Sequence, residues 1–208
     1  MSTEDFFLPK PTLSGSLVEL RPFDEESATA MLDILRDPEV LMKTGSVQND
    51  EQANHHYEIS QVKRWYSTRN EQPDRLDLAI YCKQTKQYVG EVVFNEYDSS
   101  NHSVNYRIAI GEQGRGRGLG TEATQLMIDY GFEKLGLNRI SLEVYDFNKR
   151  ARYVYTSCGF VAEGRLRQTL YYNGEYHDSI IKSIIRSDWE KQKDPDFINT
   201  ATLQEVAI

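Results

Sequence analysis

The sequence has few cysteines and histidines, and it lacks long apolar runs. Among 208 residues it holds two cysteines and four histidines. Cys82 and Cys158 lack the close spacing of a zinc site or a disulfide framework, and the histidines offer no third ligand at a fixed spacing. No apolar stretch approaches the roughly 18 residues of a membrane span. These absences disfavour a bound metal, a disulfide-stapled secreted domain and a membrane protein.

Positive charge is also scarce. The 24 Lys and Arg residues face 32 Asp and Glu residues, which gives a net charge of -8 and an isoelectric point near 5.1. Nucleic-acid binding depends on a basic face, so a nucleic-acid partner is disfavoured and a cationic or amine partner is favoured.

Length and the two ends of the sequence set the expected organisation. A chain of 208 residues predicts a single domain over 1–208, with a core over about 17–189 and flexible tails over 1–16 and 190–208. Residues 1–10 lack a basic segment followed by an apolar one, and two reduced thiols suit a reducing compartment. We therefore expect a cytoplasmic protein.

Glycine is concentrated in one run that follows an apolar, strand-like stretch and precedes a helical pattern. The run consists of Arg115, Gly116, Arg117, Gly118, Leu119, Gly120 and Thr121. Glycines let the backbone approach an anion, and the free N–H groups and positive dipole end of a following helix attract it. The two arginines add positive charge. The run therefore predicts a phosphate cradle, and its flanking elements disfavour a simple glycine-rich surface turn.

The spacing of the glycines limits the classes of phosphate ligand that the run could bind. A dinucleotide loop requires G-x-G-x-x-G, and counted from Gly114 or from Gly116 the last glycine is missing. An ATP or GTP loop ends in Gly-Lys followed by Ser or Thr, whereas here Arg117 and Gly118 occupy those positions. Dinucleotides and nucleoside triphosphates are both disfavoured.

The pattern R/Q-x-x-G-x-G/A fits as Arg115, Gly118 and Gly120, and it resembles the pyrophosphate loop of the GCN5-related N-acetyltransferases (GNAT), which use acetyl-CoA. A downstream block resembles the second motif of that family: Leu142-Glu143-Val144, Asn148, Ala151, Tyr155 and Gly159-Phe160. Residues 148–178 are similar to the RimJ/RimL branch, which includes ribosomal-protein and polyamine acetyltransferases. The resemblance covers about 17–189 and is strongest from residue 106 onward.

The periodicity and the resemblance together imply an α/β (mixed α+β) GNAT fold. Its central twisted sheet is mostly antiparallel, with about seven strands, one parallel splayed pair and about four flanking helices. We expect strands over 17–21, 76–82, 88–97, 103–110, 140–144, 160–167 and 179–185. We expect helices over 24–36, 51–68, 121–135 and 149–157, and no regular element after residue 188.

The resemblance assigns cofactor contacts beyond the glycine run. Backbone N–H groups of Ile108, Ala109 and Ile110 are implied to bind the thioester and pantetheine, on a strand that splays from its parallel neighbour. Asn148 is a competent N-cap, and its spacing from Tyr155 is two helical turns, so both lie on one helix face. That face is expected to lie along the bound cofactor.

Tyr155 matches the general acid of the family. A phenol stays protonated at neutral pH and can donate to a departing thiolate. The sequence has 13 tyrosines, so a packing role is the alternative. The register with Asn148 and Gly159 favours the catalytic role.

Glu143 is the leading candidate for the general base. It interrupts an apolar strand, where burial would raise the pKa of its carboxyl toward a useful value. A structural carboxylate is the alternative interpretation. Glu91 and Glu96 on the preceding strand are rivals, acting directly or through water.

These patterns predict an acetyl-CoA-dependent N-acetyltransferase that works by direct transfer without a metal. The acceptor is a primary amine, either a protein N-terminus or a small polyamine-like or drug-like amine. The alternative is a non-catalytic acyl-CoA-binding or regulatory module. No nucleic-acid or membrane partner is expected, and the resemblance makes a homodimer plausible. The sequence leaves open the acceptor, the base and the oligomeric state.

Overall fold

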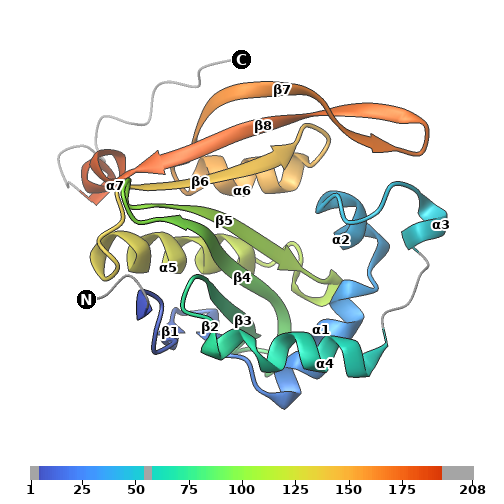
Figure 1. The fold of residues 1–208 in the computed structure, drawn as a ribbon, viewed down its shortest axis with the longest axis horizontal. Helices are drawn as coiled ribbons and strands as arrows, with labels where there is room; N and C mark the ends of the chain where they lie inside the picture. The colour runs from blue at the N-terminus through green and yellow to red at the C-terminus, as the bar shows by residue number, and fades with distance from the viewer. Residues whose placement is uncertain (1–4, 54–57, 194–208) are drawn as a thin grey trace.

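The computed structural model describes residues 5–53 and 58–193, and its centre is one mixed sheet (Figure 1). In this part of the chain the sheet has eight strands in the order β1-β2-β3-β4-β5-β6-β8-β7. The strands are β1 (Leu13–Ser14), β2 (Val18–Arg21), β3 (Leu76–Cys82), β4 (Gln87–Asp98), β5 (Ser103–Ile110), β6 (Arg139–Tyr145), β7 (Val161–Tyr172) and β8 (Glu175–Ile185). β5 and β6 pair parallel, and the other neighbours pair antiparallel. The predicted mixed fold, with a mostly antiparallel sheet and one parallel pair, is confirmed.

Seven α-helices and two short 3-10 helices accompany the sheet in the described ranges. The α-helices are α1 (Glu25–Leu35), α2 (Pro38–Lys43), α3 (Asp50–Ala53), α4 (Ile59–Ser67), α5 (Leu119–Glu133), α6 (Lys149–Ser157) and α7 (Arg186–Lys193). The 3-10 helices are η2 (Arg69–Glu71) and η3 (Glu112–Gly114). Of the helices described, not one is both long and apolar enough to cross a bilayer.

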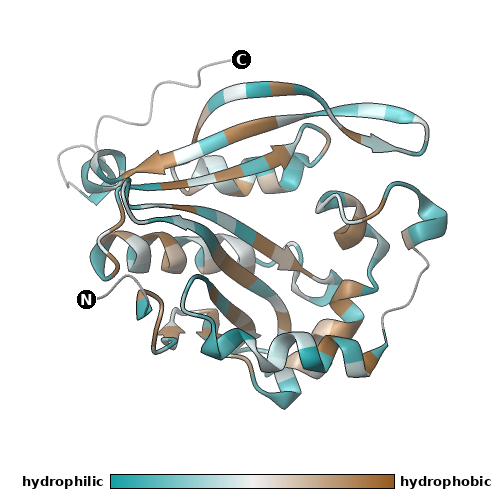
Figure 2. Cartoon of the chain, in the orientation of Figure 1, coloured by the Kyte–Doolittle hydropathy of each residue, from teal (hydrophilic) through white to brown (hydrophobic). Residues whose placement is uncertain are grey.

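The helices cover both faces of the sheet. Residues of α5 and α6 pack with alternate residues of β2 to β6 in the largest buried cluster. A second cluster joins α1 and α4 to the opposite face through Ala79 and Tyr88. Figure 2 shows hydrophobic segments along β4 and β5, whereas much of β7 is hydrophilic. Nearly all of β7 is exposed, which agrees with its position at the edge of the sheet.

Local sequence signals explain where the helices begin. Asp24 and Ser27 form a reciprocal capping box at the start of α1. Asn148 caps α6, because its Oδ1 accepts the backbone N–H of Ala151 at 3.2 Å. Gly118 is the N-cap of α5 with φ +76°. The caps of α5 and α6 fix the starts of two helices that border the site.

The structure corrects the predicted ends of several elements. No helix was expected over residues 37–50, but Pro38 is the first residue of α2 and Asp37 caps it by accepting the N–H of Glu39 at 2.9 Å. The helix expected over 51–68 corresponds to α3 and α4, and residues 54–57 between them lie outside the described residues. β1 adds an eighth strand to the seven expected.

Parts of both expected tails are packed. Phe7 is only 2% exposed and belongs to the main buried cluster. Residues 186–193 form α7, whose Trp189 is buried and donates its indole N–H to Asp129 at 2.7 Å. Burial of Phe7 places part of the expected N-terminal tail in the folded core, whereas Trp189 is the last residue of the expected core and α7 continues beyond it to Lys193. Residues 1–4 and 194–208 lie outside the described residues.

Candidate active site

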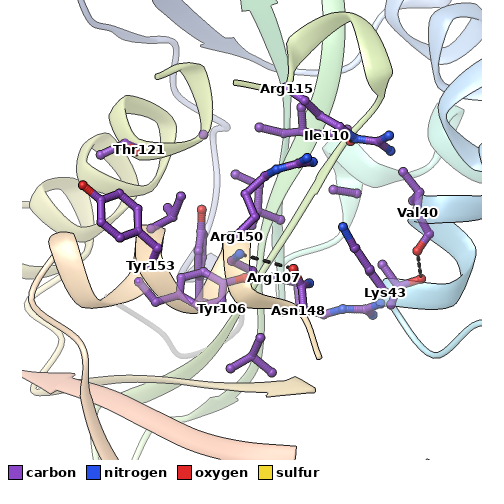
Figure 3. Close-up of a pocket in the computed structure, with 18 of the residues that line it drawn as sticks. Val40, Lys43, Tyr106, Arg107, Ile110, Arg115, Thr121, Asn148, Arg150 and Tyr153 are labelled. Carbon is purple, nitrogen blue, oxygen red and sulfur yellow. Dashed lines mark hydrogen bonds between the residues drawn. The ribbon is translucent and has the colours of Figure 1, made fainter. Parts of the chain in front are cut away.

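A pocket of about 670 Å³ opens between the glycine run, β5, β6, α2 and α6 (Figure 3). Its lining includes ten of the eleven predicted cofactor-binding residues, which are Ile108, Ala109, Ile110, Arg115, Gly116, Gly118, Leu119, Gly120, Thr121 and Asn148. Both predicted catalytic residues, Tyr155 and Glu143, also line it. The structure thus brings segments that are distant in sequence to one cavity.

The glycine run presents free backbone N–H groups to the pocket. Gly116 and Gly118 have φ values of +70° and +76°, in the left-handed region that residues with a Cβ rarely adopt. The first backward hydrogen bond of α5 is from the N–H of Glu122 to the carbonyl of Gly118, at 3.1 Å. The preceding N–H groups of Leu119, Gly120 and Thr121 have no acceptor within the helix. This arrangement suits an anion such as a diphosphate.

The two arginines of the run lie differently from what the sequence suggested. Arg115 lines the pocket, but its Nη1 contacts Glu39 at 2.6 Å and its Nη2 contacts Asp37. Arg117 is not among the lining residues, and its guanidinium donates to Gln84 Oε1 at 2.8 Å. The positive charge of both side chains is therefore directed away from the cradle, which leaves the backbone as its main anion-binding feature.

The parallel strands diverge next to this loop, as the sequence resemblance implied. β5 and β6 pair only at Ser103 with Arg139, Val104 with Ile140, and Asn105 with Ser141. Beyond these pairs, residues 106–110 remain paired with β4 alone. The edge of β5 that carries Ile108 to Ile110 therefore leaves backbone groups unpaired toward the pocket, where an extended ligand can bind them.

Tyr155 lies on α6 at the point where the strands diverge. Its side chain is 6% exposed, and its ring packs edge-on to Tyr106 and Phe160 at centroid distances of 6.3 and 5.7 Å. Burial raises the pKa of the Tyr155 phenol well above its ordinary value. Within residues 5–53 and 58–193 no side chain or backbone group makes a hydrogen bond to its hydroxyl. A neutral phenol that lines the pocket can donate a proton there.

The three candidate carboxylates lie in different environments. Glu143 lines the pocket and is exposed, so the expectation that it is buried within its strand is wrong. Glu96 also lines the pocket, at an irregularity of β4 where its φ is +54°. Glu91 is not a lining residue, and burial, followed by the charge of Asp77, raises the pKa of its carboxyl to about 7. Geometry thus favours Glu143 and Glu96 over Glu91.

Sequence reasoning missed several charged residues of the pocket. Glu39 and Lys43 come from α2, which was not predicted, and Arg150 comes from the first turn of α6. Glu39 contacts Arg115, Lys43 and Arg150, and a hydrogen bond from Lys43 is the main cause that lowers its pKa. These ion pairs connect α2 to the glycine run and to α6.

Arg107 and Asn105 were also missed, although their strand carries a signal for them. Polar residues at 103, 105 and 107 alternate with apolar residues at 104, 106 and 108. Such alternation predicts one buried and one open face. Both residues line the pocket on the open face. Among the described residues no group of three His, Cys, Asp or Glu side chains could hold a metal ion.

Comparison with known proteins agrees with this geometry. Residues 18–161 match the family model for the acetyltransferase (GNAT) domain. The chain belongs to the GNAT acetyltransferase family.

Related sequences match parts of the GNAT chain. YdaF of Bacillus subtilis, whose name marks it provisionally as a ribosomal N-acetyltransferase, is 33% identical over 50% of this chain and 57% of its own length. Spermidine N(1)-acetyltransferase of Escherichia coli is 30% identical over 54% of this chain and 59% of its own length. The chain thus spans little more than half the length of these two curated relatives.

A solved structure matches more of the GNAT chain. The crystal structure of spermidine N-acetyltransferase from Vibrio cholerae, in complex with CoA and spermine, has a TM-score of 0.74 and 22% identity. The likeness covers 85% of this chain and 99% of that chain. The two proteins share their fold.

Proposed function

We propose that this chain transfers the acetyl group of acetyl-CoA directly to a primary amine. The observation that carries the proposal is the continuity of one pocket. The pocket runs from the free N–H groups of the glycine run, along the unpaired edge of β5, to Tyr155 and Glu143. An anion site, an extended binding edge and an acid next to carboxylates are the three features that this reaction requires.

The cofactor end would hold acetyl-CoA mainly through the backbone. The N–H groups of residues 116–121 bind the diphosphate, and those of Ile108 to Ile110 bind the pantetheine and the thioester carbonyl. Asn148 lines the same side, with its amide already used as the cap of α6. Bound acetyl-CoA supplies the activated acetyl group, and the residues around it orient that group toward the acceptor.

The proton transfers fall to side chains at the other end. Glu143, or Glu96 through water, takes the proton that the acceptor amine must lose before attack. The amine nitrogen then bonds to the acetyl carbon while the carbon–sulfur bond breaks, and Tyr155 donates its proton to the departing thiolate. Burial keeps Tyr155 protonated at neutral pH, which supports this assignment.

The acceptor is a protein N-terminal amine or a small amine of the polyamine or drug type. The names of the relatives support both classes, as ribosomal and spermidine acetyltransferases are among them. We also infer a RimJ/RimL-like enzyme, a cytoplasmic location and a single domain over residues 1–208, with a homodimer as its assembly.

Two measurements test the proposal. Calorimetry of the purified chain with CoA should show saturable binding, and thiol release from acetyl-CoA should depend on an added amine from a panel of peptides, polyamines and drug-like amines. Binding without amine-dependent thiol release would instead favour a non-catalytic acyl-CoA-binding module. No association with CoA by a folded chain would refute the proposal.

A further inference from the structure

Arg107 differs from the other basic side chains of the pocket. Lys43, Arg115 and Arg150 all contact the carboxylate of Glu39. Arg107 is exposed, and across residues 5–53 and 58–193 its guanidinium makes no ion pair or hydrogen bond. An arginine that lines a cavity with its five donors uncommitted is available to a ligand.

The position of Arg107 assigns it to the acceptor end. Asn105 and Ser141 form the last pair between β5 and β6. Arg107 and Glu143 each lie two residues beyond that pair, on the strand faces that alternate with the buried Tyr106 and Leu142. They therefore flank the point where the two strands diverge.

The surroundings of Arg107 agree with this position. Figure 3 shows Arg107 next to its strand neighbour Tyr106 and well away from Arg115. Its positive charge lowers the pKa of the Tyr155 and Tyr145 phenols and of the Glu91 carboxyl, in each case against the larger effect of burial. Arg107 thus faces the reacting groups and not the phosphate cradle.

Opposite charges line the same end of the pocket. Glu96 and Glu143 are exposed lining residues, and neither takes part in an ion pair within the described residues. This end therefore offers unpaired carboxylates for an ammonium group and one unpaired guanidinium for an anion. A polyamine carries only cations, which the guanidinium repels. An amine that also carries a carboxylate satisfies both charges, because arginine binds carboxylates through paired hydrogen bonds.

We propose that the acceptor is a primary amine with a carboxylate a few bonds away, and that Arg107 binds this carboxylate. The inference rests on the proposed acetyl transfer and narrows its substrate class. Free α-amino acids and peptides with an acidic residue near the N-terminus share this chemistry. Arg107 is then a specificity-determining residue, and it holds the amine next to Glu143.

Matched acceptors test the inference. Each free amino acid is compared with its carboxamide, and each peptide with Asp or Glu at its second position is compared with the Asn or Gln counterpart; spermidine is included as a cationic acceptor. A charged hydrogen-bonded pair predicts that the wild type prefers the carboxylate member by about tenfold in kcat/KM. The arm with the larger ratio identifies whether a free amino acid or a peptide supplies the carboxylate.

Variants connect the preference to Arg107. Arg107→Gln should bring the ratio close to one, chiefly by raising KM for the carboxylate acceptor, and Arg107→Lys should retain part of it. The KM for acetyl-CoA should stay within about twofold in both variants, because Arg107 lies away from the glycine run. Arg167→Gln makes the same chemical change at an exposed position of β7 outside the pocket, and it should keep the wild-type ratio.

Two results would overturn the inference. The first is that the wild type acetylates amines without preferring the carboxylate member, or that Arg107→Gln leaves the preference intact. Either outcome would show that Arg107 does not bind the carboxylate of the acceptor, and the proposed acetyl transfer would still stand. If no acceptor is acetylated and acetyl-CoA does not bind, the proposed function fails and the inference fails with it.

Discussion

The two ends of the pocket are built in different ways. The cofactor end is largely formed by contiguous residues, 115–121, whose glycines set the backbone conformation. The acceptor end is assembled from α2, β4, β5 and β6, which are far apart in the sequence. A local motif can therefore identify the cofactor end, whereas the acceptor end exists only once the sheet and α2 are packed.

The ends also differ in how they carry charge. At the cofactor end the charge of Arg115 is paired with Asp37 and Glu39, so the backbone N–H groups remain to bind an anion. At the acceptor end Arg107, Glu96 and Glu143 line the pocket without ion pairs among the described residues. We therefore expect replacement of charged side chains to change activity most at the acceptor end. At the cofactor end, replacement of a glycine that sets the backbone conformation should change activity most.

The largest effect is expected at Glu143. If its carboxylate is the base, Glu143→Gln removes the proton acceptor and should lower kcat/KM by about a hundredfold. The acidic limb of the pH–rate profile should disappear as well. A profile that keeps its acidic limb would rule Glu143 out, and the same measurement on Glu96→Gln would then identify the alternative base.

At the cofactor end, Gly118→Ala should weaken acetyl-CoA binding by about tenfold or more, because a Cβ at φ +76° strains the N-cap that aims the N–H groups of α5. Calorimetry measures the change. Gly174→Ala is the matched control, since Gly174 has φ +90° in the β7–β8 turn, outside the pocket. Equal loss of binding in both variants would indicate general destabilisation and would contradict a local role for Gly118.

The same contrast explains what the sequence could predict of the fold. The strands of the sheet and helices α5 and α6 follow from alternation, helical periodicity and caps such as Asn148. Helix α2 was missed because Pro38 reads equally as the end of one helix or the first residue of another. α7 was missed because its stability depends on burial of Trp189 against Phe132, a tertiary contact that local pattern does not contain.

The same limits apply to the site. Burial of Glu143 was expected because its strand is apolar, but the divergence of β5 from β6 removes the neighbour that would cover it. Glu39 could not be predicted without α2. Arg107 could have been identified from the alternation of its strand, although its lack of an ion-pair partner could not.

Tyr155 lies between the cofactor end and the acceptor end of the pocket, so its replacement can separate chemistry from cofactor binding. Tyr155→Phe removes the acid and should lower turnover by roughly tenfold, while acetyl-CoA affinity stays nearly intact because the cradle is unchanged. Turnover and calorimetry on the same variant separate these effects. Tyr130→Phe, a partly buried tyrosine of α5 outside the pocket, is the control. Unchanged turnover in Tyr155→Phe would reassign this phenol to packing.

Glu91 does not line the pocket, and its replacement is expected to have the smallest effect on turnover. Burial and the charge of Asp77 raise the pKa of its carboxyl from 4.5 to about 7 in the folded chain. At a pH between these two pKa values, the Glu91 carboxyl is ionised in the unfolded chain but mostly protonated in the folded chain. Rising pH therefore favours unfolding. Relative to Glu91→Gln, which cannot ionise, the wild type should therefore lose stability from pH 4.5 to about 7, by roughly 3 kcal/mol at most.

Urea unfolding of the two proteins at several pH values across this range measures the difference. Turnover of Glu91→Gln should stay close to wild type, because Glu91 does not line the pocket. Parallel stability curves would show that the carboxyl ionises equally in both states. A large loss of turnover with unchanged stability would instead return Glu91 to the candidate bases, because it lies opposite Ala109 on the sheet face that also carries Arg107.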